Sequence, residues 1–201
     1  ISQKSFIDLY KQGREYRIEA PALWCTKCQT TIAQVELEDR DIESKFNDIV
    51  FKVNGKKIIV STTRPELLPA TVAVFVNPKD KRYHNLVGKK AKVPLFNFEV
   101  PILEDEKADP EKGTGVVMCC TFGDQTDMEW QKEHKLKIKT AITKDGKMTS
   151  LARKYRGMEI KQAREKILED LKKQKLLVKQ KDIVHPVNVH ERCGTEIEFI
   201  H

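Results

Sequence analysis

Short apolar runs, separated by turn-forming residues, fill much of the first 120 residues of this 201-residue chain and limit its fold more than any other feature. Asn54-Gly55, between two apolar runs, is a strong hairpin signal. Pro94, Pro101 and a glycine turn at 113–115 separate the later runs. Strand-like segments are expected around 16–19, 31–37, 49–61, 91–94, 97–103 and 115–120, a density that predicts a barrel or sandwich core.

Helical periodicity is found in a few stretches. Residues 3–13 predict a short helix, residues 67–77 a helix followed by a strand, and residues 124–135 a helix opened by an acidic residue. Residues 159–178 give the clearest helix, with an apolar stripe formed by Ile160, Ala163, Ile167, Leu168 and Leu171. Strand is expected again over 183–200. The order of strand-rich, helical and strand segments predicts an α+β fold, with a β-barrel-like core of short strands and flanking helices.

The charge is unevenly distributed. The chain has 37 basic and 30 acidic residues, a net charge of 37 − 30 = +7, and residues 131–180 alone carry 16 basic and 6 acidic residues. A polyanionic partner and a solvated, lysine-rich helical surface both explain this segment. No apolar run approaches the roughly 20 residues of a membrane-spanning helix. The five cysteines and the polar, signal-free first 20 residues argue against a disulfide framework. We therefore expect a cytoplasmic monomer.

Both ends of the chain carry half of a metal-site pattern. Cys25 and Cys28 are separated by two residues, and so are His190 and Cys193. Together they predict a closed, tetrahedral Cys₃His site for a structural zinc ion, with His185 as an alternative fourth ligand. A reduced thiol pair near an unrelated histidine is the competing explanation. A zinc site would join the two ends, as a domain inserted into a host protein requires, and the chain reads as a piece of a longer polypeptide.

Two central segments carry polar groups suited to chemistry. In residues 61–67, Thr62, Thr63 and Arg64 follow an apolar strand and offer several hydrogen-bond donors. The same segment also predicts a helix start with Thr63 as its cap. In residues 113–130, a turn, a buried strand and a glycine lead to Asp124 and Asp127. Asp124 suits the N-cap of a helix and Asp127 its third position, although Asp127 could instead bind an ammonium group of a substrate.

Read together, these segments resemble the editing domain of class I aminoacyl-tRNA synthetases, the connective-peptide insertion of the valyl, isoleucyl and leucyl enzymes. The similarity is carried by segments that cover nearly the whole chain: 22–28, 62–66, 70–78, 81–88, 113–115, 120–130 and 190–198. Among the three enzymes, the archaeal-type valyl-tRNA synthetases are the most similar. The resemblance implies a single editing domain over 1–201, with linking strands in 1–35 and 183–201 and an editing core in 36–182.

The implied activity is hydrolytic proofreading, in which a positioned water removes threonine mischarged onto valine tRNA. By resemblance, Asp127, Thr62 and Thr63 would be catalytic. The implied substrate-binding residues are Arg64, Asp124, Gly113, Thr114 and Gly115. Partners would be the 3′ end of valine tRNA and the rest of the host synthetase. Editing needs no cofactor, whereas ATP would serve only the synthetic site of the full-length ligase.

Some positions depart from the family pattern. Many bacterial-type valyl enzymes have Lys, Thr and His where this chain has Met118, Cys120 and Gly123, and Thr where it has Leu67. The sequence therefore leaves open whether Asp124, Thr62, Thr63 or a backbone group recognises the threonine hydroxyl. Three alternatives remain. One is an isoleucyl-type domain that clears valine, one is a non-catalytic zinc-bearing tRNA-binding module, and one is a cysteine-dependent enzyme using Cys119 or Cys120.

Overall fold

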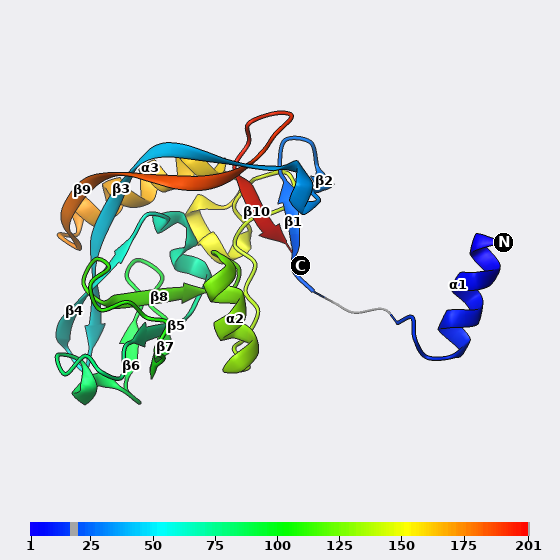
Figure 1. Ribbon diagram of the computed structural model, residues 1–201. Helices are drawn as coiled ribbons and strands as arrows, with labels where there is room; N and C mark the ends of the chain where they lie inside the picture. The colour runs from blue at the N-terminus through cyan, green and yellow to red at the C-terminus, as the bar shows by residue number, and fades with distance from the viewer. Residues whose placement is uncertain (17–19, 201) are drawn as a thin grey trace.

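The computed structural model describes residues 1–16 and 20–200, and these form a curled seven-stranded sheet beside a small three-stranded one (Figure 1). The large sheet has the order β4–β3–β6–β7–β5–β8, and β9 also pairs with β3. Its strands are β3 (Leu37–Val53), β4 (Lys56–Thr62), β5 (Thr71–Val76), β6 (Lys90–Lys92), β7 (Glu99–Glu104), β8 (Val116–Cys120) and β9 (Leu177–His190). β4 and β8, from the two ends of the order, approach each other, so the sheet curls into a half-barrel. The predicted α+β class with a barrel-like core is confirmed.

The small sheet has the order β10–β1–β2 and brings the C-terminal part of the chain next to its N-terminal part. Its strands are β1 (Ala22–Cys25), β2 (Thr30–Thr31) and β10 (Ile197–Ile200), and all its pairs are antiparallel. The expected strand at 31–37 is wrong in its extent. Only Thr31 is in β2, and a 3₁₀ turn over Gln34–Glu36 intervenes before β3 begins. Residues 17–19 of the strand expected at 16–19 lie outside the described residues.

Three α-helices lie within the described residues, and they agree with the predicted positions. They are α1 (Ser2–Lys11), α2 (Gln125–Glu133) and α3 (Ile160–Lys173). α3 ends before the predicted residue 178, because Lys175 adopts a φ of +55° and β9 begins at Leu177. The apolar stripe of α3 is confirmed, since Ala163, Ile167 and Leu171 are buried in the main core. Within the same residues, no helix combines the length and apolar content that crossing a membrane requires.

The hairpin of β3 and β4 turns at Asn54-Gly55 as predicted. Both turn residues have positive φ, +48° and +80°, which matches the right-handed twist of the strands. β3 continues far beyond the predicted strand, toward the N-terminus, and pairs with β9 from Leu37 to Ile49. Figure 1 shows β3 and β9 as one long curved ribbon that extends from the large sheet toward the small one. This β3–β9 ribbon forms one wall of the cavity described below.

Candidate functional site

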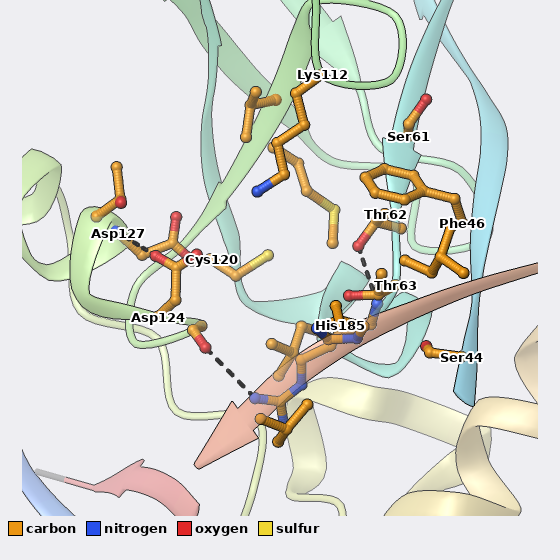
Figure 2. A pocket seen from close by; sticks show the side chains of 18 of the residues that line it. Ser44, Phe46, Ser61, Thr62, Thr63, Lys112, Cys120, Asp124, Asp127 and His185 are labelled. Atoms are coloured by element: carbon orange, nitrogen blue, oxygen red, sulfur yellow. Dashed lines mark hydrogen bonds between the residues drawn. The ribbon is translucent and has the colours of Figure 1, made fainter. Parts of the chain in front are cut away.

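A cavity of about 640 Å³ opens between the β3–β9 ribbon, the end of β4, strand β8 and the start of α2. Five residues of the predicted site line it: Thr62, Thr63, Arg64, Asp124 and Asp127. Met118, Cys120 and Gly123, the positions that depart from the family pattern, line it as well. Figure 2 shows Thr62 and Thr63 on one side of the cavity and Cys120, Asp124 and Asp127 on another, although these residues are up to 65 positions apart in the sequence. The structure therefore brings both chemical segments into one pocket.

The start of α2 positions the two acids. Asp124 is the N-cap, and its Oδ1 accepts a hydrogen bond from the backbone N–H of Asp127 at 2.9 Å, so the capping interpretation is confirmed. Asp127 lies one turn deeper, and only 6% of it is exposed. Gly123 makes room for its carboxylate, because a Cβ on residue 123 would lie 2.2 Å from Asp127 Oδ2. Asp127, whose role helix capping explains less well than that of Asp124, is thus the buried acid of the two.

Burial raises the pKa of Asp127 well above its usual value, and the nearby carboxylate of Asp124 raises it further. Hydrogen bonding from the backbone of Cys120 and Gly123 counters only part of this effect. No basic side chain forms an ion pair with Asp127 among residues 1–16 and 20–200. A buried acid in this state would be stabilised in its ionised form by a cation that enters the cavity.

The threonine hydroxyls stand at the end of β4. Thr62 Oγ1 accepts a hydrogen bond from the backbone N–H of Arg64 at 3.0 Å, which leaves its hydroxyl hydrogen available. Within the described part of the chain, the Thr63 side chain makes no hydrogen bond. The expected cap at Thr63 is wrong. The 3₁₀ helix η2 (Pro65–Ala70) begins one residue later, with Arg64 in the N-cap position and no side-chain cap. Thr63 therefore keeps its full hydrogen-bonding capacity for the cavity.

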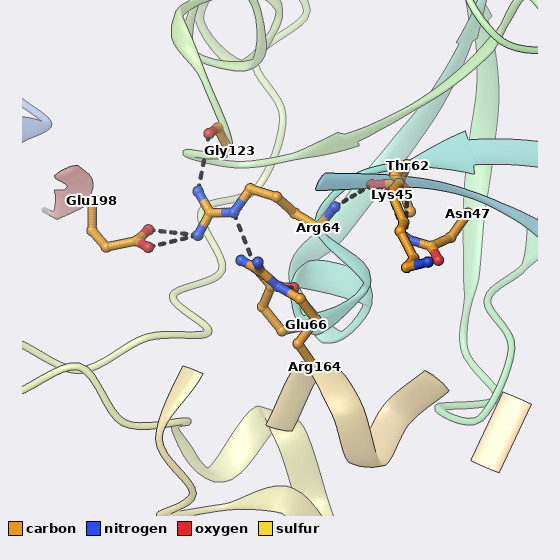
Figure 3. Close-up of polar contacts among 8 residues, drawn as sticks. All are labelled: Lys45, Asn47, Thr62, Arg64, Glu66, Gly123, Arg164 and Glu198. Carbon is orange, nitrogen blue, oxygen red and sulfur yellow. Dashed lines mark hydrogen bonds and ion pairs between the residues drawn. The ribbon is translucent and has the colours of Figure 1, made fainter. Parts of the chain in front are cut away.

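Arg64 lies at the cavity wall, but its charge is already balanced. Its Nη2 donates to both carboxylate oxygens of Glu198 at 2.7 and 2.8 Å, and its Nε donates to Glu66 at 3.1 Å (Figure 3). Glu66 is fully buried and also binds Arg164 at 2.8 Å. Burial alone would lower the pKa of Arg64, but Glu198 and Glu66 together raise it above its ordinary value. These contacts balance the charge of the guanidinium within the protein.

The predicted glycine turn does not line the cavity. Gly113 has a φ of +63°, and a Cβ there would lie 2.6 Å from the Cβ of Ser61. Thr114 Oγ1 donates to the carbonyl of Ile59 at 2.7 Å. A Cβ on Gly115 would meet Arg82 at 2.8 Å. The close approach that the glycines allow is therefore to other parts of the protein, namely Ser61 beside Gly113 and Arg82 beside Gly115.

Much of the cavity wall was missed by the sequence analysis, and three of the missed residues carry polar or aromatic groups toward the site. His185, which was considered only as a metal ligand, pairs with Ile42 on the ribbon and lines the cavity. Phe46 and Lys112 line it too, from β3 and from the turn before β8 (Figure 2). In the sequence, the one indication that any of these residues belongs to the site was the position of Lys112 directly before the glycine turn. Nothing in the local sequence shows that β9 would pair with β3.

Cys119 and Cys120 do not form a reactive thiol site. Both are buried in β8, and burial raises the pKa of each far above its usual value. A protonated thiol is a poor nucleophile, so the geometry disfavours a cysteine-dependent enzyme.

The four predicted metal ligands come together at the small sheet. The candidate ligand atoms of Cys25, Cys28, His190 and Cys193 all lie within 4.8 Å of one another. Two tight turns place them: Gly194 has a φ of +66°, and Gln29, at the end of the first turn, has a φ of +52°. Three thiols and an imidazole are the donor set that a structural zinc ion takes. His190, not His185, is the histidine of this cluster.

Comparisons with known proteins identify similar chains in fold and in sequence. No protein-family model matches the chain. In fold, the chain is similar to a LeuRS of Agrobacterium radiobacter K84, solved as a ternary complex with tRNA and LeuAMS. The TM-score is 0.52 at 16% identity, over 92% of this chain and 32% of that one. This likeness shows that the chain shares the fold of a part of that LeuRS.

Sequence similarity gives the particular relatives. The chain is 51% identical to the valine–tRNA ligase of Haloarcula marismortui, with 100% of the chain and 23% of that protein covered. It is 49% identical to those of Methanocaldococcus jannaschii and Rickettsia conorii, with 99% and 100% of the chain covered and 23% and 25% of those proteins. Along its whole length, the chain is homologous to a segment of valine–tRNA ligases. It spans about a quarter of their length.

Proposed function

We propose that the cavity is a hydrolytic editing site that removes threonine from valine tRNA. The observation that carries the proposal is Asp127, a buried acid in the cavity without a cationic partner among the described residues. The substrate would be an aminoacyl ester, whose α-ammonium group is a cation of suitable size. Pairing with it would restore the ionised state of Asp127 and fix the ester in one orientation.

In this proposal the hydroxyls of Thr62 and Thr63, at the end of β4, contact the ester and the side chain of the bound threonine. Thr63, with its unused hydroxyl, would donate to or accept from the hydroxyl of threonine, a contact that valine lacks. A site built on such a contact rejects the analogue without the hydroxyl, because a polar group is then left unpaired. Thr62 would donate to the ester or to the attacking water. Asp124 would cap α2 and strengthen the negative potential around Asp127.

No covalent intermediate is required. A water molecule held near the ester by Thr62 and Asp127 would attack the carbonyl carbon. The C–O bond to the ribose would then break, and the ribose oxygen would take up a proton. Arg64 would act as a positioning residue through its contacts with Glu198 and Gly123. The turn at 113–115 would likewise position the cavity wall.

The wider setting belongs to the same proposal. The editing core would comprise residues 36–182, and residues 1–35 and 183–201 would link it to a host synthetase in the cytoplasm. The exposed lysines of the 131–180 segment would face tRNA, without reading its sequence. A zinc ion at the Cys₃His cluster would hold the two linking turns together. ATP would be used only elsewhere in the ligase.

The test compares three esters on one valine tRNA. We expect the chain to hydrolyse threonyl-tRNA faster than valyl- or isoleucyl-tRNA, and Asp127→Asn to lower the rate by about 100-fold, because an electrostatic contact made at the reacting group is lost. Asp182→Asn, on the exposed outer side of β9, is the matched control and should keep the rate. Binding of a threonyl-adenosine joined by a non-hydrolysable amide provides a second readout.

Each alternative predicts a different pattern. Fastest hydrolysis of the valyl ester would support the isoleucyl-type domain. Salt-sensitive tRNA binding that survives Asp127→Asn, without hydrolysis or analogue binding, would support the non-catalytic module. Equal rates for wild type and Asp127→Asn would contradict the proposed site.

A further inference from the structure

Lys112 differs from the other basic residues of the cavity wall. Arg64, Lys107 and Arg164 are each paired with a carboxylate at 2.7–2.8 Å, from Glu198, Glu133 and Glu66 respectively. Lys112 forms no ion pair within residues 1–16 and 20–200. Figure 2 shows its ammonium group pointing into the cavity, between the wall with Cys120 and the wall with Thr62. Lys112 is thus a cation of the cavity wall that no described residue of the protein balances.

The turn of residues 109–115 is fixed so that Lys112 points inward. The backbone N–H of Lys112 donates to the carbonyl of Asp109 at 3.2 Å, and its own carbonyl accepts from Gly115 at 3.1 Å. Thr114 bonds the carbonyl of Ile59, and Tyr83 donates its hydroxyl to the carbonyl of Thr114 at 2.8 Å. Contacts on both sides therefore anchor the turn, and only the Lys112 side chain is left to move.

Two charged side chains of the cavity wall differ in sign and in exposure. Asp127 is buried, whereas Lys112 is exposed. A buried acid suits a compact ammonium group that sheds its water on binding. An exposed lysine suits an anion that keeps part of its hydration, because full burial of a phosphodiester would be costly. An oxyanion formed at the ester would instead need donors in the inner, drier part of the site.

We propose that Lys112 binds the phosphate of the 3′-terminal nucleotide of the aminoacylated substrate. This inference rests on the proposed editing function and adds a positioning residue to it. The ammonium group at Asp127 and the phosphate at Lys112 would fix the two ends of one aminoacyl nucleotide, so that the ester lies between them beside Thr62. A correctly placed ester is what a water-based mechanism requires.

The experiment uses two ligands that differ by one group: threonyl-adenosine with a non-hydrolysable amide link, and the same molecule with a 5′-phosphate. Calorimetry measures their affinities for the wild-type chain, Lys112→Ala, Lys112→Arg and the exposed control Lys89→Ala. We expect the phosphate to strengthen binding to the wild type about two- to fivefold, as an exposed ion pair does. Lys112→Ala should remove this gain and leave the affinity for the unphosphorylated ligand unchanged.

Two further readouts should agree. Lys112→Arg and Lys89→Ala should keep the gain in affinity that the phosphate gives. Added salt should reduce this gain in the wild type to the extent that screening of an exposed ion pair predicts. Equal affinity of the wild type for both ligands would overturn the inference. Equal loss of both affinities in Lys112→Ala would also overturn it, because the lysine would then serve the aminoacyl part or the fold. Binding of neither ligand would overturn the editing proposal itself.

Discussion

Arg64 and Glu198 form a doubly hydrogen-bonded ion pair across 134 residues of the chain, with N–O distances of 2.7 and 2.8 Å. Arg64 follows β4 in the large sheet, and Glu198 lies in β10 of the small sheet. The pair therefore joins the cavity wall to the sheet that carries the candidate metal cluster. Figure 3 shows how Glu66 and Arg164 continue the same network toward α3.

Loss of Glu198 should destabilise the protein. Glu198→Ala would leave Arg64 in a largely buried position with Glu66 alone, and removal of one partner of a buried pair costs about 3 kcal/mol. Chemical denaturation measures the change in the free energy of unfolding. Glu38→Ala breaks the Arg40–Glu38 pair, in which both side chains are nearly half exposed, and should cost far less, because water screens an exposed pair. Similar losses in the two variants would show that the buried pair is not structurally important.

Asp127→Asn should raise stability at neutral pH. Because the pKa of Asp127 is higher in the folded than in the unfolded protein, the contribution of this one group to stability is greatest below the ordinary Asp value of 3.8 and is lost as the pH rises toward the folded pKa. The asparagine variant lacks this loss. Its advantage, about 0.5–2 kcal/mol, should grow with pH in melting experiments from pH 4 to 8. An advantage that shrinks as the pH rises would contradict the raised pKa.

Gly123→Ala should reduce activity more than stability. The added methyl group would lie 2.2 Å from Asp127 Oδ2, and the carboxylate can swing away at little cost to the fold. We expect threonyl-ester hydrolysis to fall nearly as far as in Asp127→Asn, with a small change in melting temperature. Gly88→Ala is the converse control. Gly88 has a φ of +79°, which strains any residue with a Cβ, but no atom lies within 4 Å of the added Cβ. This variant should therefore lower the free energy of unfolding by about 1 kcal/mol and leave the rate of hydrolysis unchanged. Full activity of Gly123→Ala would show that the observed position of Asp127 is not required.

The Cys₃His cluster should bind one zinc ion per chain. Cys28→Ser should abolish this binding, measured by elemental analysis, and chelators should lower the melting temperature of the wild type only. Cys28 is exposed, so its replacement removes a ligand without opening a cavity in the core. Cys119→Ala, a buried cysteine outside the cluster, should keep the metal. Unchanged zinc content in Cys28→Ser would refute the predicted ligand set.

Local signals in the sequence predicted much of the fold correctly. The Asn54-Gly55 turn, the cap at Asp124 and the stripe of α3 depend on residues within a few positions of one another, so they can be read without the rest of the chain. The metal cluster was also predicted, because the spacing of its two halves is local even though the halves lie far apart.

The β3–β9 ribbon could not be predicted from local patterns. Between Leu37 and Phe46, most side chains of β3 are exposed and charged or polar, so no apolar alternation marks a strand. These residues are extended because β9 pairs with them, from Leu177 to His190. The same pairing brings His185 into the cavity, where sequence spacing had associated it only with the metal ligands.

The sequence by itself determined the residue types of the site and their local roles, because caps, tight turns and paired ligands depend on neighbours along the chain. Tertiary structure alone decided which of those residues stay available for binding a ligand. Glu198 comes from a distant strand to neutralise Arg64, and no base comes to Asp127 or acid to Lys112 among the described residues. The physical reason is that the charge balance of a cavity depends on every side chain that folding brings to its wall, and most of these lie far away in the sequence.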